Sequence, residues 1–126
     1  MEEVRWNIRS FTTDTGRKPV LEWIASLDEG AQAAVKESVL LLREYGVTLD
    51  MPHSRHLGQG LWELRARDSS GIYRVIYFHW RGRTLCLLHG FTKKTQRTPP
   101  ADISLARQRM DTWLRRSSEG KRRNNQ

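Results

Sequence analysis

Residues 61–94 read LWELRARDSSGIYRVIYFHWRGRTLCLLHGFTKK, and this stretch decides the fold of the chain. It contains three runs rich in aliphatic, β-branched and aromatic residues, at positions 61–67, 72–80 and 84–91. The two short segments between them have the length that joins neighbouring antiparallel strands. The sequence therefore predicts a three-stranded antiparallel meander.

Side chains alternate between the two faces of a sheet, and this period places the charged residues of the meander. On the first strand, one face holds Trp62, Leu64 and Ala66, and the other holds Leu61, Glu63, Arg65 and Arg67. Arg74 on the second strand is expected on the same side as Arg65, and the third strand ends at the pair Lys93 and Lys94. Fixed cations on one face of a sheet are suited to binding a phosphate backbone.

The first half of the chain predicts a strand and a helical hairpin. A weak alternation over residues 4–11 predicts a short strand. Pro19 is suited to the first turn of a helix, Asp28 is expected to cap a second helix, and Gly46 to end it. Residues 47–60 have no sustained period and are predicted to be a loop.

After the meander, Pro100 opens a segment whose apolar residues fall at helical spacing, which predicts a third helix. Residues 117–126 are predicted to be a basic disordered tail that follows a domain spanning residues 1–116. This order of elements is typical of an α+β fold with a helical hairpin on a mostly antiparallel sheet. The third helix is expected to cover the apolar end of the other face and to leave a groove beside the arginines.

The positive charge of the chain is concentrated in its strand-rich third. The formal net charge is +8, yet residues 1–52 hold six Lys and Arg against nine Asp and Glu, whereas residues 53–97 hold nine against two. Nucleic acid is therefore the first partner to consider. An anionic membrane surface would instead favour cations on an amphipathic helix, so no membrane partner is expected.

Other sequence features restrict the protein class. No apolar run approaches the roughly 18 residues of a membrane span, and the start MEEVRWNIRS lacks the regions of a signal peptide, so a cytoplasmic protein is expected. The lone Cys86 excludes an intramolecular disulfide and is predicted to be buried in the sheet. The histidines and carboxylates show no paired ligand spacing, so neither a metal nor another cofactor is expected.

The runs LWELRARDSSGIYRVIY and LLHGFTKKTQRTPPADISLARQRM resemble the RelE superfamily of type II toxins, and most closely its phage-derived, HigB-like branch. The resemblance covers residues 4–115 and rests on LWELR, GIYR and FTKK taken together. It implies a RelE-like fold and a ribosome-dependent endoribonuclease that cleaves mRNA. It also implies inhibition by a cognate antitoxin, often a helix-turn-helix protein.

RNA cleavage without a metal uses the 2′-OH of the substrate as nucleophile, so the protein must orient it, move protons and stabilise the phosphorane. Arg65 and Arg74 are candidate phosphate clamps, and Lys93 and Lys94 are candidates for charge stabilisation or proton transfer. A histidine is a further candidate proton carrier, and His56 is chosen among His53, His56 and His89. The residues expected to bind RNA are Arg55, Arg67 and Arg97.

Other interpretations remain open. Arg65 and Arg74 can equally be solvated residues of a sheet face that pair with Glu63 or Asp68. The tyrosine that serves as general base near the C-terminus of some RelE-type toxins has no counterpart after Tyr77. The alternative function is a non-catalytic binder with the same fold, either a gyrase-directed toxin like ParE or a basic nucleic-acid-binding module.

Overall fold

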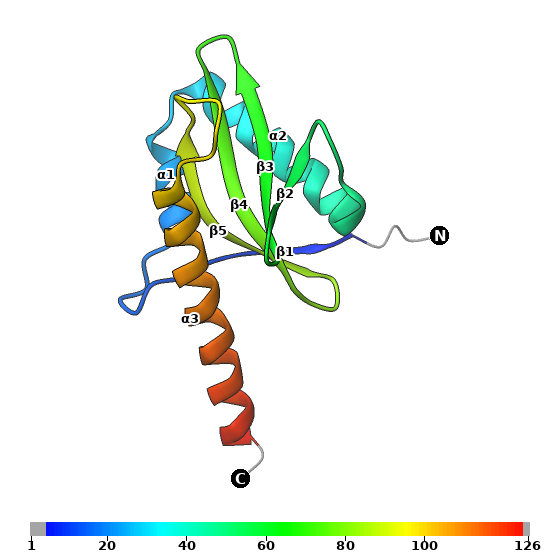
Figure 1. Cartoon of the computed structure of the whole chain (residues 1–126), viewed down its shortest axis with the longest axis vertical. Coiled ribbons are helices and arrows are strands. Elements are labelled where there is room, and N and C mark those ends of the chain that lie inside the picture. Colours follow the sequence, from blue (N-terminus) through cyan, green and yellow to red (C-terminus); the bar gives the residue numbers. More distant parts are fainter. Residues whose placement is uncertain (1–4, 125–126) are drawn as a thin grey trace.

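The structure, a computed structural model, describes residues 5–124, with side chains described as far as residue 120. Within this range the chain forms one five-stranded sheet of order β1-β5-β4-β3-β2, three α-helices and a short 3-10 helix (Figure 1). The elements are β1 (Asn7–Ser10), α1 (Pro19–Ser26), α2 (Glu29–Tyr45), η1 (Gly46–Thr48), β2 (Ser54–Gly58), β3 (Leu61–Asp68), β4 (Gly71–Arg81), β5 (Thr84–Thr92) and α3 (Pro100–Asn124). The predicted α+β fold and the meander β3-β4-β5 are confirmed.

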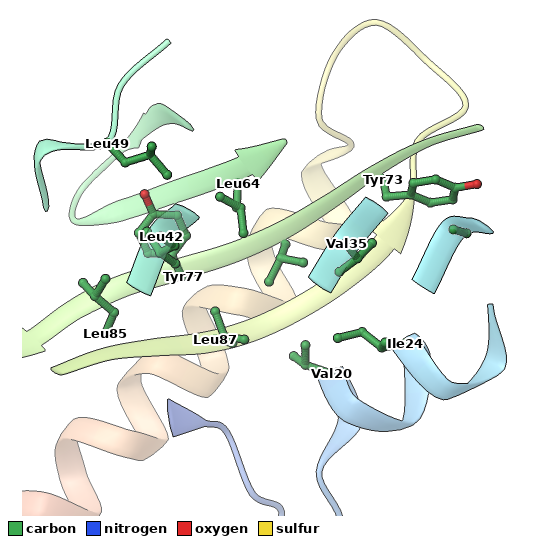
Figure 2. Packing of buried hydrophobic residues seen from close by; sticks show 12 residues of the cluster. Val20, Ile24, Val35, Leu42, Leu49, Leu64, Tyr73, Tyr77, Leu85 and Leu87 are labelled. Atoms are coloured by element: carbon green, nitrogen blue, oxygen red, sulfur yellow. The ribbon is translucent and has the colours of Figure 1, made fainter. Parts of the chain in front are cut away.

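The sheet separates two cores that follow the alternation of its strands. On one face, α1 and α2 pack on the sheet, and Figure 2 shows Val20, Ile24 and Val35 directed toward residues such as Leu87 of β5. On the other face, α3 covers a second cluster that includes Ile76 of β4. Because both faces are covered by helices, β4 and β5 are apolar on both sides over most of their length.

The two ends of α2 follow the sequence signals. The Asp28 side chain accepts a hydrogen bond of 2.8 Å from the backbone N–H of Ala31, which satisfies an amide that the first turn of the helix leaves unpaired. Gly46 follows the helix with φ of 56°, and a Cβ atom at this position would lie 2.0 Å from Cε2 of Trp6. Glycine is therefore required there both by the backbone conformation and by the neighbouring ring.

The prediction of a loop over residues 47–60 is wrong in part, because Ser54–Gly58 forms β2 at the edge of the sheet. This strand pairs antiparallel with β3, from Ser54 opposite Leu64 to Gly58 opposite Leu61, with an irregularity after His56. An edge strand with several exposed residues and a bulge carries little apolar alternation, so the sequence signal for it is weak.

The N-terminal strand is confirmed as β1, which is shorter than predicted and pairs in parallel with β5. Residues 1–4, where the predicted strand begins, lie outside the described residues.

The C-terminal helix is longer than expected. The chain remains helical as far as Asn124, so residues 117–124 are not the irregular tail that the sequence predicts, while residues 125–126 lie outside the described part. Figure 1 shows this end of α3 extending beyond the sheet. An ion pair of 4.0 Å between Arg115 and Glu119, four residues apart, supports the extension. In the described part of the chain, no helix is long and apolar enough to cross a membrane.

Candidate active site

Strand register brings the two predicted phosphate clamps together. Arg65 of β3 lies opposite Arg74 of β4, and Arg74 lies opposite Phe91 of β5. Residues that face each other directly across an antiparallel pair project to the same side of the sheet. The two guanidinium groups therefore share one face, as the alternation of the sequence predicts.

A buried carboxylate lies between these arginines. Glu63 is fully buried, and its Oε1 lies 3.2 Å from Nε of Arg74 and 3.7 Å from Nε of Arg65. The hydroxyl of Thr98, in the loop before α3, donates a hydrogen bond to Oε2. One negative charge thus holds two positive charges on the sheet and ties the loop of residues 93–99 to them.

Arg74 is held in place by its neighbours, yet not all hydrogen-bond donors of its guanidinium group are used. The residue is only 8% exposed, and its Nη1 donates a hydrogen bond of 3.0 Å to the carbonyl of Tyr73. Within the described residues, neither Nε of Arg74 nor Oε1 of Glu63 makes an aligned hydrogen bond, although the two atoms are close. The pair is therefore mainly electrostatic, and donors of the guanidinium remain available to an anion.

Burial lowers the pKa of Arg74, the Glu63 carboxylate raises it, and the nearby Arg65 guanidinium lowers it. A guanidinium nevertheless stays protonated in proteins, so Arg74 is a permanent, partly desolvated cation. Electrostatic attraction to a phosphate is stronger in such a setting than in open water.

Lys93 completes the cluster. Burial lowers the pKa of its ammonium group; Glu63 opposes this effect, and the positive charges of Arg74, Arg65 and Arg55 lower the pKa further. Neighbouring cations thus act on Lys93 in the direction that proton transfer near neutral pH requires. Arg55 of β2 lies opposite Glu63 of β3, so β2 also contributes a cation to this face. We refer to Arg55, Glu63, Arg65, Arg74 and Lys93 as the cation cluster.

A groove opens beside the cation cluster, along the half of β3 that extends past the end of β2. It has a volume of about 470 Å³ and lies between α2 and the arginine-bearing strands. Its lining consists of Ala34, Glu37, Ser38, Leu41, Pro52, His53, Arg65, Ala66, Arg67, Ile72 and Arg74. Three of the arginines identified from the sequence therefore meet in one concave site, together with a histidine.

The remaining candidates are distributed differently. Lys94 and Arg97 are exposed in the loop that begins at the cation cluster. His56 is not brought to the cluster: it lies opposite Trp62, which packs on the core under the helical hairpin, and the two ring centroids are 4.6 Å apart. His89 is engaged by α3, with Nε2 at 2.5 Å from Oδ1 of Asp102.

Two residues of the site were not among the sequence candidates. Alternation puts Glu63 on the arginine face, but only as a pairing partner for a solvated arginine. Its complete burial and its hydrogen bond from Thr98, in the loop before α3, are not visible in that pattern. No sequence pattern indicates a role for Thr98, because its position over the sheet is set by the path of the loop of residues 93–99. Among the residues whose side chains are described, no group of three or more His, Cys, Asp or Glu residues could hold a metal ion.

The arrangement of sheet and helices is consistent with the RelE-like fold, and the cation cluster on the sheet is compatible with an anionic partner. Residues 22–111 match the family described as Phage derived protein Gp49-like (DUF891). The match covers well over half of the chain, which therefore belongs to this family, and the family is associated with RelE-type, toxin-like proteins. Among curated proteins, none matches the chain at a significant level.

Proposed function

We propose that this protein is the toxin of a type II toxin-antitoxin system, of the HigB-like branch, and that it cleaves mRNA on the ribosome without a metal ion. The observation that carries the proposal is the cation cluster, in which Arg65, Arg74 and Lys93 surround a buried carboxylate at the side of a groove. Membership of a toxin-like family supports the same class.

The chemistry follows from the position of each cation. Arg74 and Arg65 bind the scissile phosphate and stabilise the additional negative charge of the phosphorane. Lys93, with its lowered pKa, exchanges a proton with the attacking 2′-OH or the leaving 5′-oxygen. Arg55, Arg67 and Arg97 contact neighbouring phosphates and fix the register of the RNA. This assignment replaces His56, which lies on the other face of the sheet, with Lys93 as the proton carrier.

The proposed partners are the ribosome with its bound mRNA and a cognate antitoxin of the helix-turn-helix type. The cytoplasm is the compartment in which such a protein acts, because translating ribosomes are its target. A small helix-turn-helix protein encoded beside this chain is the expected source of the antitoxin.

The test is single-turnover cleavage of ribosome-bound mRNA by purified protein that has been stripped of bound metal with a chelator and then transferred to ribosome buffer. Wild-type protein should cleave, and Arg74→Ala should be slower by a factor of about 100 or more, because it removes charge stabilisation from the transition state. Arg74→Lys should recover little, since an ammonium cannot make the planar two-pronged phosphate contact.

Arg81→Ala is the matched control, because Arg81 is an exposed arginine of the same strand whose guanidinium lies over the ring of Trp80, outside the cation cluster. It should cleave at the wild-type rate. Wild-type cleavage by a folded Arg74→Ala protein would exclude the proposed role. Inhibition of DNA gyrase without RNA cleavage would instead assign a ParE-like function.

A further inference from the structure

A second groove lies on the other side of α2, between the helical hairpin and β1. Its volume is about 1240 Å³, larger than the groove beside the cation cluster. The α2 residues that line it, such as Lys36 and Leu40, are not those that line the first groove. The two grooves therefore flank one helix, and this one takes no part in the proposed cleavage. We call it the β1 groove.

The β1 groove presents aliphatic side chains to solvent. Leu40 of α2 is 60% exposed and Leu21 of α1 is 47% exposed, and both line it. Ile24 and Val39 of the same two helices continue this surface. Exposed leucines from two adjoining helices, joined to further aliphatic residues in one concavity, are the kind of surface that a partner covers.

The charge of the β1 groove is of one sign. Its lining contains Arg9, Lys18, Lys36 and Arg43, and within the described residues no Asp or Glu takes part in that lining. This contrasts with residues 1–52 as a whole, where acidic residues outnumber basic ones by nine to six. The basic residues are thus gathered at the groove although the segment that builds it is acidic.

Two buried polar atoms of the lining also lack a partner. In the described structure, Oγ of Ser10 and Nε1 of Trp113 are buried and make no hydrogen bond. Such atoms are costly to leave unpaired. These atoms lie beneath the surface of the groove, so its occupant is inferred from the aliphatic side chains and the cations that are exposed there.

We propose that the β1 groove binds a segment of a partner protein that carries leucine-like apolar side chains together with Asp or Glu. The aliphatic floor buries the apolar side chains, and the four cations pair with the carboxylates. Nucleic acid is a poorer occupant, because the exposed aliphatic side chains of Leu21 and Leu40 offer nothing to a sugar-phosphate backbone. The inference does not rest on the proposed cleavage, because it uses none of the residues of the cation cluster.

The test is selection of binders from a displayed library of random peptides against the full-length protein, followed by affinity measurements with the enriched peptides. The enriched sequences should combine acidic and aliphatic residues. Leu40→Glu and Lys36→Glu should each weaken their binding by a factor of about ten or more, because each places a carboxylate opposite the acidic peptide. RNA cleavage by both variants should remain at the wild-type rate.

Two control variants make comparable changes outside the groove, one at an exposed apolar residue and one at an exposed cation. Val47→Glu alters an apolar residue of η1 that is 50% exposed, and Arg115→Glu alters an exposed cation of α3; neither residue lines the groove, so both variants should bind the peptides as the wild type does. Enriched peptides without acidic residues, or equal binding to all four variants, would overturn the proposal. Displacement of the peptides by single-stranded RNA would assign the groove to nucleic acid, and self-association lost in Leu40→Glu would assign it to a second copy of the chain.

Discussion

Glu63 is the residue on which the cation cluster depends. It is fully buried, and its nearest counter-charges are the guanidinium groups at 3.2 Å and 3.7 Å. We expect Glu63→Gln to lower the free energy of unfolding by about 3 kcal/mol, because it leaves buried Arg74 without a counter-charge. Urea denaturation measures this loss.

The exposed residue Glu44 provides the control, since Glu44→Gln makes the same chemical change in water and should alter stability by less than about 0.5 kcal/mol. Adding Arg74→Met to Glu63→Gln should recover part of the loss, because it removes the unpaired charge. Equal stability of Glu63→Gln and wild type would mean that the carboxylate contributes nothing to the fold.

The proposed role of Lys93 in proton transfer predicts a pH dependence of the cleavage rate. Its pKa is lowered from 10.5 by burial and by neighbouring cations, so its neutral form becomes available at lower pH than that of an ordinary lysine. If the neutral amine accepts the proton, the cleavage rate should rise with pH until the lowered pKa is passed. Lys93→Arg should abolish this rise, because a guanidinium does not titrate in that range.

Glu63 raises the pKa of Lys93, so Glu63→Gln should move the rising limb of the rate profile to lower pH, provided that the protein is folded. Single-turnover rates across a pH series measure both effects, with Lys36→Arg as a control for lysine substitution in general. A rise that persists in Lys93→Arg would assign proton transfer to another group.

The arginine face was predictable, whereas the environment of its members was not. Arg65 and Arg74 follow from the period of two along β3 and β4, a local property of the chain. The pKa of Lys93 depends on charges from three other strands, and the exclusion of His56 depends on the pairing of an edge strand that the sequence did not reveal. Such properties arise from contacts between distant segments, which alternation alone does not encode.

At the scale of the elements, α3 has two parts with different roles. Residues up to Met110 and Trp113 pack on the sheet, and Arg116 donates a hydrogen bond to the carbonyl of Thr12 and pairs with Asp14. Beyond this point, the described contacts of Ser117 and Glu119 are with α3 itself. Deleting residues 117–126 should therefore change the free energy of unfolding by less than about 0.5 kcal/mol.

Deleting residues 116–126 also removes the contacts of Arg116 with Thr12 and Asp14. This deletion should lower the free energy of unfolding by about 1 kcal/mol. Thermal melting of the two truncated proteins compares them directly. Loss of cooperative melting in the protein that lacks only residues 117–126 would show that the domain extends beyond Arg116.

The two helices of the hairpin and the three meander strands could be assigned from the sequence, because each carries a complete period and clear end signals such as Asp28 and Gly46. The extension of α3 was missed for a physical reason. Residues 117–120 bury little apolar surface and include Ser and Gly, which are weak helix formers. The helix continues there without support from packing on the sheet, and a polar composition of this kind is typical of disordered segments.

On the scale of the whole molecule, positive charge is carried mainly by the sheet and its loops, where residues 53–97 hold nine cations against two anions. The logarithm of the association constant for single-stranded RNA should therefore fall linearly with the logarithm of the salt concentration. The slope should be about −0.7 for each phosphate neutralised. Arg67→Ala, at the exposed edge of the groove, should lower the magnitude of the slope by about one such step.

Fluorescence anisotropy over a salt series measures the slope. Arg115→Ala on the distant part of α3 is the control and should leave it unchanged. An affinity independent of salt would show that the sheet face does not bind the phosphate backbone.

The parallel pairing of β1 with β5 also constrains when the cation cluster can form during synthesis of the chain. The first strand to be translated, Asn7–Ser10, pairs with Thr84–Leu87. The Glu63 carboxylate of the cation cluster accepts a hydrogen bond from the hydroxyl of Thr98. Neither arrangement can form before most of the chain has left the ribosome, since non-local strand pairing is late and slow. A chain released earlier lacks α3 and exposes the apolar face of Ile76 and Phe78, which favours aggregation over function. The ribosome that translates this protein therefore finishes the chain before the cation cluster is complete.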